Sequence, residues 1–465
     1  MSCLYERKIS EFIWNIEVND KDLFCSKLST LLYELKREWK YAIFISDLDE
    51  KEKLEEYLCY LFCLIGHMRD GFYGYSERDL SYRMIYIWYS VFPILSIFAL
   101  HTLFLEDDAG DLPYGGWKDF KYFCREISRI STYSKSDSLI DICISIVNHS
   151  IDIDLSMINE KVSDLCLFIP KETGAYSWLF DRLVLDRDPI MGHKGFMKKQ
   201  FRLDISSLKN RYNDQENCLV CCHKGKYDIV STNGFIGDYI RGVLCDLSGD
   251  WHIKWSKLVR SFSRIVNTIP IIVLTADITD EMLYHMIGYV CLLSCIRGSS
   301  GRVLILSTVP IWLDISDKWN DISGMASELW SYCKSRRTRV DWDYSVQFLL
   351  DAVSSMGSSN YHFFEPIKLF FFGSSFSLEH LMRLRDSSSQ IALVLWKIGG
   401  DYIDISNYNL KGVLFLSGRS PSLMRNFYKV YNSGDSYSWN SVVLMNTRYD
   451  RLRNYFHSNI SIKNA

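Results

Sequence analysis

Two different rhythms of apolar and polar positions divide this chain. Up to about residue 210, apolar residues recur three and four positions apart, as at Leu28, Leu31, Leu32 and Leu35, which is the spacing of an amphipathic helix. Turn-forming stretches such as 111–116 separate these segments, and strand-like alternation is scarce. The pattern predicts a helical first part, with stacked helix pairs of the helical-repeat or solenoid type.

From about residue 265 the rhythm changes to short apolar runs that alternate with helical segments. The runs cover 269–276, 302–308 extended through 311–313, 367–372, 391–396 and 413–416. This alternation is typical of a parallel sheet with helices on both faces. We therefore expect an α + α/β protein with a helical domain over 1–211, a connector over 212–264 and an α/β domain over 265–465.

One helical stretch allows two interpretations. Residues 84–105 are apolar apart from Ser90, Ser96, His101 and Thr102, which is long enough to span a bilayer. The alternative is a buried helix, or two short helices broken near Pro93. We favour burial because no second span occurs elsewhere and long apolar helices often fill helical cores. We expect no membrane partner.

Composition and charge narrow the class of protein. The chain has 465 residues, is 48% hydrophobic and carries a net charge of -3, so binding to nucleic acid must come from local patches. Its 14 cysteines are scattered, and the first residues lack the apolar core of a signal peptide. These features predict reduced thiols and a cytoplasmic location.

An acidic turn follows the apolar run 269–276. Asp277, Thr279 and Glu281 stand where the predicted strand passes into a helix, at the carboxyl end where α/β sheets hold ligands. Carboxylate and hydroxyl oxygens there suit Mg²⁺. The alternative role for Asp277 is to cap the helix that follows.

Short motifs also occur in a fixed order along the chain. They are His-Met-Arg-Asp at 67–70, Ser-Glu-Arg-Asp at 76–79, Tyr-Gly-Gly-Trp-Lys-Asp at 114–119, Ile-Pro-Lys-Glu at 169–172 and the Lys-Gly-Val…Ser-Gly-Arg-Ser-Pro stretch at 411–421. This order resembles an uncharacterised family of plant, fungal and giant-virus proteins. The resemblance implies a TROVE/HEAT-like helical domain, related to that of Ro-type RNA-binding proteins, followed by a von Willebrand A-like (Rossmann-like) domain.

The resemblance also implies a metal-ion-dependent adhesion site, and two of its three loops depart from the family pattern. Asp277, Thr279 and Glu281 match the first loop. Val346 stands at the second-loop threonine position and Ser374 at the third-loop aspartate position. A hard cation such as Mg²⁺ seldom tolerates the loss of its carboxylates. We expect a degenerate site that binds no metal and no other cofactor.

Cations gather in three places. Two of the clusters have aromatic neighbours, and single-stranded RNA binds such surfaces through its phosphates and by base stacking. For any one cluster, a solvated helix face is the more common explanation. The candidate RNA-binding residues are Lys194, Lys198, Lys199, Arg202, Lys209, Arg211, Lys254, Lys257, Arg260 and Arg264. The third cluster comprises Lys334, Arg336, Arg337 and Arg339.

Other candidate chemistry is weaker. Cys218, Cys221, Cys222 and His223 have zinc-like local spacing but lack a second ligand pair, so structural thiols are the preferred interpretation. No nucleotide-binding glycine motif and no nucleophile elbow is present. We therefore expect neither enzymatic activity nor a small-molecule substrate.

These observations lead to one preferred function and two alternatives. We expect a non-enzymatic RNA-binding or ribonucleoprotein scaffold protein with RNA or protein partners. The first alternative is a structural subunit of a larger assembly, such as a viral one, because abundant aromatics suit protein–protein contacts. A metal-dependent adhesion module is the weakest of the three.

Overall fold

The computed structural model describes most of the chain. The described residues are 2–15, 21–70, 75–106, 113–157, 162–187, 194–222, 235–245, 250–262, 268–296, 301–318, 321–357, 367–388, 391–400, 413–421, 423–424 and 450–460. Contacts divide the chain into two compact units. The sheet unit comprises Met1–Tyr60, Gly71–Ser76 and Val230–Asn446, and the helical unit comprises Leu61–Asp70, Glu77–Ile229 and Thr447–Ala465.

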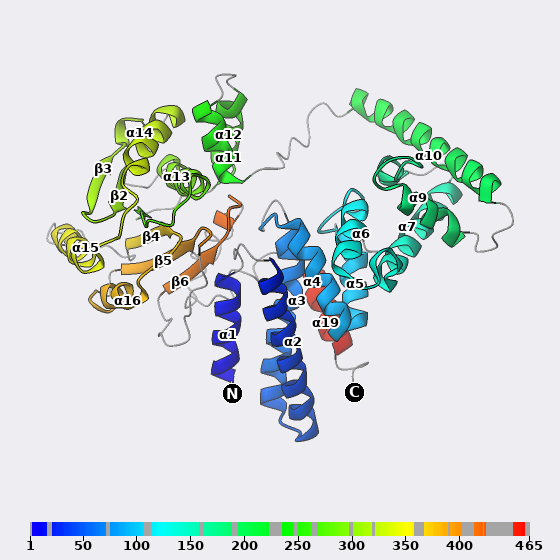
Figure 1. Cartoon of the computed structure of the whole chain (residues 1–465), viewed down its shortest axis with the longest axis horizontal. Coiled ribbons are helices and arrows are strands. Elements are labelled where there is room, and N and C mark those ends of the chain that lie inside the picture. The colour runs from blue at the N-terminus through cyan, green and yellow to red at the C-terminus, as the bar shows by residue number, and fades with distance from the viewer. Residues whose placement is uncertain are drawn as a thin grey trace. The chain divides into compact units, whose positions relative to one another are not determined.

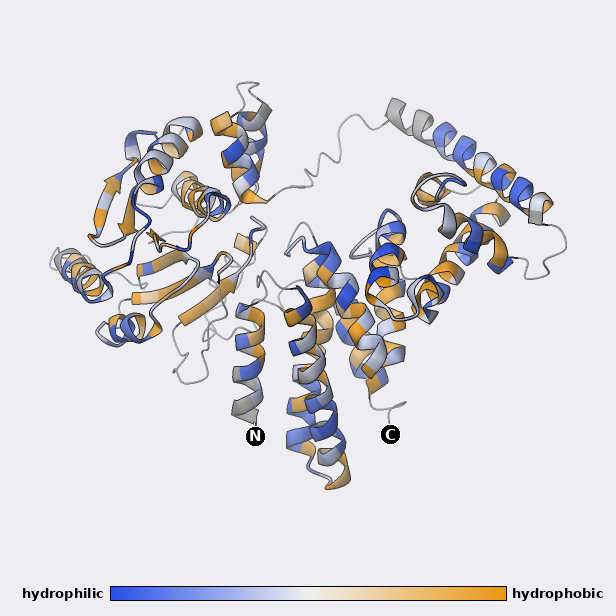
Figure 2. Cartoon of the chain, in the orientation of Figure 1, coloured by the Kyte–Doolittle hydropathy of each residue, from blue (hydrophilic) through white to orange (hydrophobic). Residues whose placement is uncertain are grey.

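The sheet unit is built on six strands. They are β1 (Thr268–Val273), β2 (Arg302–Leu306), β3 (Ile311–Asp314), β4 (Ile367–Gly373), β5 (Ile391–Lys397) and β6 (Val413–Ser417). Their order is β3-β2-β1-β4-β5-β6, and every neighbouring pair is parallel except β2 and β3. The strands are continuous apolar runs because helices cover both faces (Figure 2). The predicted mostly parallel sheet in the C-terminal half is confirmed.

The third strand differs from the sequence prediction. The run 302–313 looked like one extended strand, but it folds into two antiparallel strands in which Ile305 pairs with Ile311. Ser307 to Pro310 form the turn between them. Pro310 has no N–H for a ladder hydrogen bond, so a strand that continued through it would lose a bond.

Helices cover the two faces of the sheet (Figure 1). One face packs against α1 (Ser2–Trp14), α15 (Trp342–Gly357) and α16 (Leu378–Asp386), through a core that includes Ile271, Phe371 and Leu393. On the other face, Tyr289 stacks against Phe372. The helices of that side are α11 (Ile236–Cys245), α12 (Asp250–Arg260), α13 (Asp280–Cys295) and α14 (Ile322–Lys334).

The helix α1 belongs to the sheet unit, although it lies more than 250 residues from β1 in sequence. Trp14 is fully buried and meets the ring of Phe415 on β6 with centroids 4.6 Å apart. Lys397 Nζ donates to Asn15 Oδ1 at 2.8 Å, and both residues are buried. The compact units are therefore interleaved along the chain, whereas the sequence suggested sequential domains at 1–211 and 265–465.

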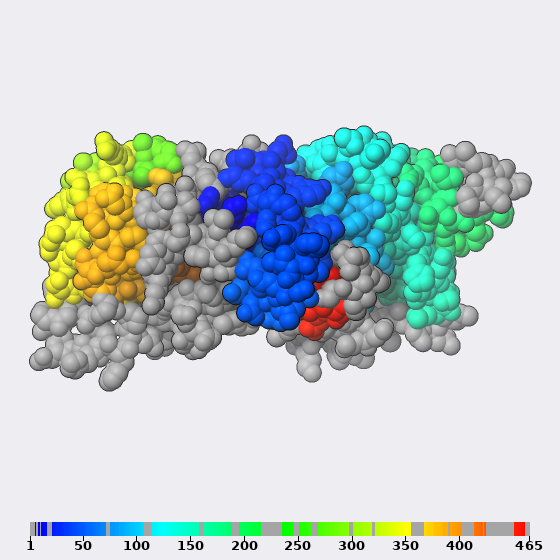
Figure 3. All heavy atoms as spheres, turned by 90° about the horizontal axis from the view of Figure 1, so that it is seen from below, coloured from blue at the N-terminus to red at the C-terminus, as the bar shows by residue number. Residues whose placement is uncertain are grey.

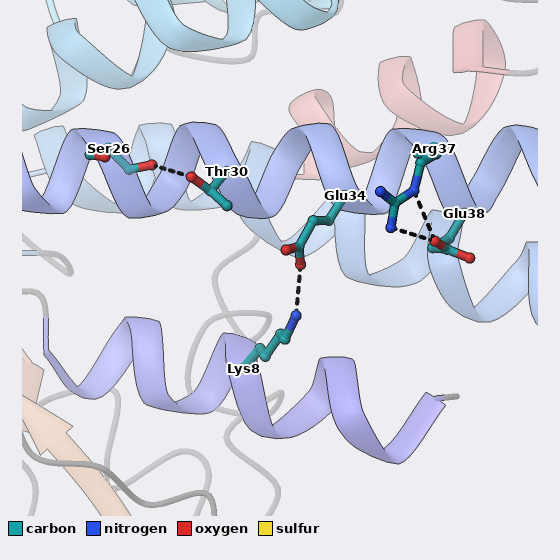
Figure 4. A network of polar contacts seen from close by, with 6 residues as sticks. All are labelled: Lys8, Ser26, Thr30, Glu34, Arg37 and Glu38. Carbon is teal, nitrogen blue, oxygen red and sulfur yellow. Dashed lines mark hydrogen bonds and ion pairs between the residues drawn. The ribbon is translucent and has the colours of Figure 1, made fainter.

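A helical hairpin follows α1. It consists of α2 (Lys21–Phe44) and α3 (Leu48–Arg69), and α3 enters the helical unit at Leu61. Lys8 Nζ donates to Glu34 Oε2 at 2.7 Å between α1 and α2 (Figure 4). Phe12 and Phe24 stack between the same helices. The pairing of α1 with α2 thus combines an apolar contact with an ion pair.

The described part of the helical unit is made of helices. They are α4 (Arg78–Val91), α5 (Pro93–Phe104), α6 (Asp119–Ile130), η1 (Ser134–Ser136), α7 (Ser138–Ser156), α8 (Leu165–Phe168), α9 (Ser177–Arg187), α10 (Lys194–Cys222) and α19 (Asp450–Ile460), together with the end of α3. The helix α19 packs on α5 through stacked rings of Phe98 and Tyr455. It groups with this unit, although the sequence prediction placed it in the α/β domain.

The apolar stretch 84–105 is two helices. Phe92 leaves helical geometry with φ -134° and ψ 77°, and Pro93 starts α5 at its first position. The predicted break near Pro93 is confirmed. Among the described residues, no helix has the length and apolar character needed to cross a membrane.

A part-buried ion pair joins two helices of the helical unit. Arg69 on α3 makes two parallel hydrogen bonds of 2.8 Å to the Asp119 carboxylate at the start of α6. The Tyr82 hydroxyl donates to Asp119, and Gly116 N donates to its Oδ2 at 3.0 Å. Burial and Asp119 raise the pKa of Tyr82 far above its usual value, so the hydroxyl stays protonated. The Arg69–Asp119 pair therefore has a structural role, since it joins the end of α3 to the start of α6.

Candidate functional site

The carboxyl edge of the sheet at β1 and β4 is the first candidate site. The crossovers that leave β1 and β4 run toward opposite edges, so this is the topological switch point at which open α/β sheets hold ligands. The loop 274–279 follows β1, and Ser374 follows β4. Thr275 Oγ1 and Ser374 Oγ are 3.0 Å apart and share a hydrogen bond. The fold therefore brings the first and third predicted loops together.

Two of the three predicted first-loop residues are engaged by the chain itself. Thr279 Oγ1 accepts from Met282 N at 3.2 Å and caps α13. Glu281 Oε1 accepts from Arg419 Nη1 at 3.0 Å. Asp277 is exposed on the turn. The helix-capping role considered for Asp277 belongs to Thr279, two residues further on.

The residues at the second and third predicted loop positions are both buried. Val346 lies in the second turn of α15 and is buried in the core that faces β1 and β4. Ser374 is fully buried and bonded to Thr275. Within the described part of the chain, no group of three or more His, Cys, Asp or Glu side chains is arranged to hold a metal ion.

The turn after β6 is held in a fixed conformation. Trp396 Nε1 and the Tyr289 hydroxyl both donate to Gly418 O, at 2.9 and 3.1 Å. Tyr289 also donates to Ser420 O at 2.9 Å, and Ile236 N donates to Arg419 O at 3.1 Å. Gly418 has φ +134°, and a Cβ there would lie 2.3 Å from Leu423 Cδ1. These contacts hold the turn so that Arg419 lies against the loop that follows β1.

A second arginine reaches the same loop. Arg337 Nη1 donates to Ile278 O at 3.1 Å, and its Nη2 contacts the Asp280 carboxylate. The sequence placed Arg337 in the third basic cluster without a link to the acidic turn. Arg337 and Arg419 together supply two positive charges to this acidic loop.

A buried histidine lies behind the turn. His285 Nδ1 accepts from Gly237 N at 2.9 Å, so its proton is on Nε2 in the neutral ring. Burial, with help from Arg419 and Arg241, lowers the pKa of His285 to about 3. Sequence reasoning missed this residue because its partner Gly237 lies in the segment that was assigned as a connector.

The first basic cluster lies on α10 of the helical unit. Lys198 pairs with Asp181 at 2.6 Å, and Arg202 contacts Glu172 at 3.4 Å. Arg211 Nη1 donates to Asp154 O at 2.9 Å. Lys199 is exposed and Lys209 is half-buried. The side chains of Lys194, Cys218, Cys221 and Cys222 and all of His223 lie outside the described residues.

The other two clusters belong to the sheet unit, one on α12 and the other at and just after the end of α14. His252 on α12 and Ser323 on α14 share a hydrogen bond of 3.2 Å. On α12, Lys254 Nζ lies 4.3 Å from the Trp251 ring centroid, and Lys257 and Arg260 are exposed. Arg264 lies outside the described residues. The 254–264 cluster therefore begins on α12, and the 334–339 cluster lies at and just after the end of α14.

Aromatic rings are interleaved with these cations. Tyr284 and Trp330 stack with centroids 4.3 Å apart and planes 1° from parallel. Arg241 lies over the Tyr284 ring, and Lys334 lies over the Trp330 ring. The Arg336 guanidinium lies 4.0 Å from the Tyr332 centroid. This pattern of cations over half-exposed rings is the chemistry that stacks on bases and neutralises phosphates.

Comparisons of the chain with family models, with curated proteins and with solved structures gave no match in any of the three.

Proposed function

We propose that this chain is a non-enzymatic RNA-binding or ribonucleoprotein scaffold protein. Its RNA contact surface is the α12–α14 face, defined by Trp251, Lys254, Lys257, Arg260, Trp330, Lys334, Arg336 and Arg339. The observation that carries the proposal is the contact of α12 with α14 through His252 and Ser323, since one cationic cluster lies on α12 and the other at the end of α14.

The α12–α14 face and α10 differ in whether their cations form ion pairs. On α10, Lys198 and Arg202 already pair with Asp181 and Glu172. Among the described residues, none of the six cations of the α12–α14 face forms an ion pair. Unpaired cations can neutralise phosphates and release counterions, which supplies most of the affinity in nucleic-acid binding.

We also propose a fold family for each of the two units. We assign the sheet unit to a von Willebrand A-like domain, supported by the acidic loop at the switch point after β1. We assign the helical unit to a TROVE-like domain, supported by the order of its motifs, with Asp119 of the Tyr-Gly-Gly-Trp-Lys-Asp motif bonded to Arg69 of the first motif.

The proposed function uses no metal. The Thr279 hydroxyl is occupied as a helix cap and Glu281 by Arg419, and Val346 offers no oxygen. A near-octahedral Mg²⁺ would need the side chains of Thr279 and Glu281 to leave their present partners.

A gel-shift assay at physiological salt tests the function. Single-stranded and structured RNAs of unrelated sequence are offered to the full chain, because the face reads phosphates and ring surfaces rather than base edges. We expect retarded complexes with a Kd below the non-specific range, which is roughly 10⁻⁴ to 10⁻⁶ M. Binding to every RNA only at the non-specific level would contradict the proposal.

A second candidate function is a subunit of a protein assembly, and one surface favours it. The tip of the α2–α3 hairpin exposes Tyr41, Phe44, Ile45 and Leu48, with Phe44 84% and Leu48 68% exposed. Figure 3 views the molecule from the side at which this hairpin (blue) ends. Apolar side chains grouped in this way mark protein contacts.

Light scattering coupled to size exclusion tests this alternative. A partner-free chain is expected to form oligomers that dissociate in a Phe44→Ser/Leu48→Ser variant. A monomer of unchanged mass at all concentrations would contradict the assembly function, and RNA binding by that monomer would support the first function.

A further inference from the structure

The helical unit holds a cavity that lies apart from the surfaces considered above. Its volume is about 800 Å³, within the range of small-molecule sites. Its wall is formed by the end of α5, the segment 113–117, the end of α7, residues 162–164 and Tyr212 of α10. No sequence pattern predicted it, because these segments are brought together only by the fold.

The charged lining of the cavity has one sign. Among the described lining residues, every charged side chain is a carboxylate: Glu106, Asp154 and Asp164. Asp154 is 6% exposed, and its two oxygens accept from Ser163 N at 3.2 Å and Ser163 Oγ at 2.6 Å. An ionised carboxylate has about four acceptor positions, so Asp154 is held in place with capacity to spare.

The cations beside the cavity do not cancel this charge at the wall. Arg211 donates to Asp154 O, and Arg451 donates to Leu105 O at 2.7 Å. Neither arginine is among the lining residues. Both donate to main-chain carbonyls, so they leave the charge of Glu106 and Asp154 toward the cavity.

Aromatic rings supply the rest of the wall. Phe104 and Trp117 are buried and stack with centroids 5.3 Å apart, 3° from parallel. Tyr212 is half-buried and lines the same space. Ring faces and carboxylates both attract cations, and the rings also accept an apolar stem.

We propose that this cavity binds an organic cation, a guanidinium or alkylammonium group carried on an apolar stem. The volume accepts more than a bare ion, the carboxylates supply the countercharge, and the rings surround the stem. Such a group can come from a free amine or from a basic side chain of another protein. The proposal does not depend on RNA binding, because it uses other residues.

Calorimetric titration of the full chain tests the proposal with three probes. They are agmatine, an arginine with acetylated and amidated ends, and the equally capped citrulline, which has nearly the shape of arginine without its charge. We expect saturable binding of at least one cation, at least about tenfold tighter than citrulline. Tighter agmatine binding identifies a free amine as the source, and tighter capped arginine identifies a protein side chain.

A variant separates the cavity from general surface charge. Glu106→Gln/Asp164→Asn changes two exposed lining acids, so the fold should persist, and it is expected to weaken cation binding by about tenfold. The matched control is Asp214→Asn, an exposed acid on α10 that does not line the cavity. Equal affinity for citrulline, no saturable heat with either cation, or undiminished binding in the double variant would overturn the proposal.

Discussion

Arg419 donates from Nη1 to Glu281 Oε1 at 3.0 Å, across 138 positions of the chain. The contact joins the turn after β6 to the first turn of α13, beside the loop that follows β1. With Arg337 bonded to Ile278 O in the same loop, the chain provides two cations at the position where the von Willebrand A-like fold that we propose would place a metal. The carboxylates of Asp280 and Glu281 are thus paired with arginines of the chain itself, and that of Asp277 is exposed.

Addition of a divalent cation should leave stability unchanged. A site that binds only the folded chain would add about 2.7 kcal/mol at a cation concentration of one hundred times its Kd. We expect no such shift of the thermal midpoint with Mg²⁺ or Mn²⁺. The control is Asp277→Ala, since Asp277 is the exposed carboxylate of the loop. Stabilisation of the wild type that is lost in Asp277→Ala would contradict the proposed metal-free site.

Two adjacent glycines of the 114–119 motif should respond differently to alanine. A Cβ on Gly115 would lie 2.4 Å from Leu103 Cδ1 and 2.9 Å from Leu103 O, whereas a Cβ on Gly116 would meet nothing within 4 Å. We expect Gly115→Ala to lower the free energy of unfolding by about 1–3 kcal/mol, because the backbone must shift. Gly116→Ala should change it by less than about 0.5 kcal/mol. Urea denaturation measures both, and equal effects would show that the close approach of Gly115 is not needed.

The pair of Arg69 with the buried Asp119 should contribute far more to stability than an exposed pair. Asp119→Ala leaves the Arg69 guanidinium and the Tyr82 hydroxyl without their shared acceptor, which should cost about 3–5 kcal/mol. Asp141→Ala removes a carboxylate that is 53% exposed and paired with Arg182, and should cost about 0–1 kcal/mol. The comparison uses unfolding free energies at neutral pH. A loss below about 1 kcal/mol for Asp119→Ala would refute the structural role.

Stability should fall with acid because of two buried histidines. Burial lowers the pKa of His67 to about 4, and that of His285 is about 3. Below the ordinary pKa of about 6.5, the unfolded chain takes up a proton that each folded ring refuses. Each histidine therefore contributes stability at pH 7 that is lost as the pH falls from about 6.5 toward its folded pKa.

The slope of this loss is measurable. Each histidine should contribute about 1.4 kcal/mol per pH unit inside its window. His285→Asn keeps an acceptor near Gly237 N and does not titrate, so its unfolding free energy should depend less steeply on pH between 6 and 5. An unchanged slope would mean that His285 is not held neutral in the folded chain.

Local patterns were enough to predict much of the sheet unit. The apolar runs at β1, β4 and β5, the helix after Thr279 and the position of Asp277 at a strand end follow from residue types within a few positions of each other. The break at Pro93 follows from proline's missing N–H in the same way.

Long-range pairing was out of reach of those patterns. The amphipathic spacing of α1 does not reveal that Trp14 packs on Phe415, and nothing in α19 indicates Phe98 as the partner of Tyr455. The contacts of Arg419 and Arg337 with the acidic loop span 138 and 57–59 positions. A metal-binding loop and a loop whose carboxylates are paired with distant arginines therefore look alike in sequence.

The salt dependence of RNA binding tests the central claim most directly. Fluorescence anisotropy of a labelled single-stranded RNA is measured over a range of NaCl for the wild type and for Lys254→Glu/Lys257→Glu/Arg260→Glu. The control, Lys118→Glu/Lys171→Glu/Lys199→Glu, changes the net charge equally at exposed lysines of the helical unit. We predict that the α12 variant loses affinity and that its plot of log K against log salt is shallower by about 2, at about 0.7 for each lost phosphate contact. The control should keep the wild-type slope. Equal slopes for all three proteins, or no binding by the wild type, would contradict the assignment of the α12–α14 face to RNA.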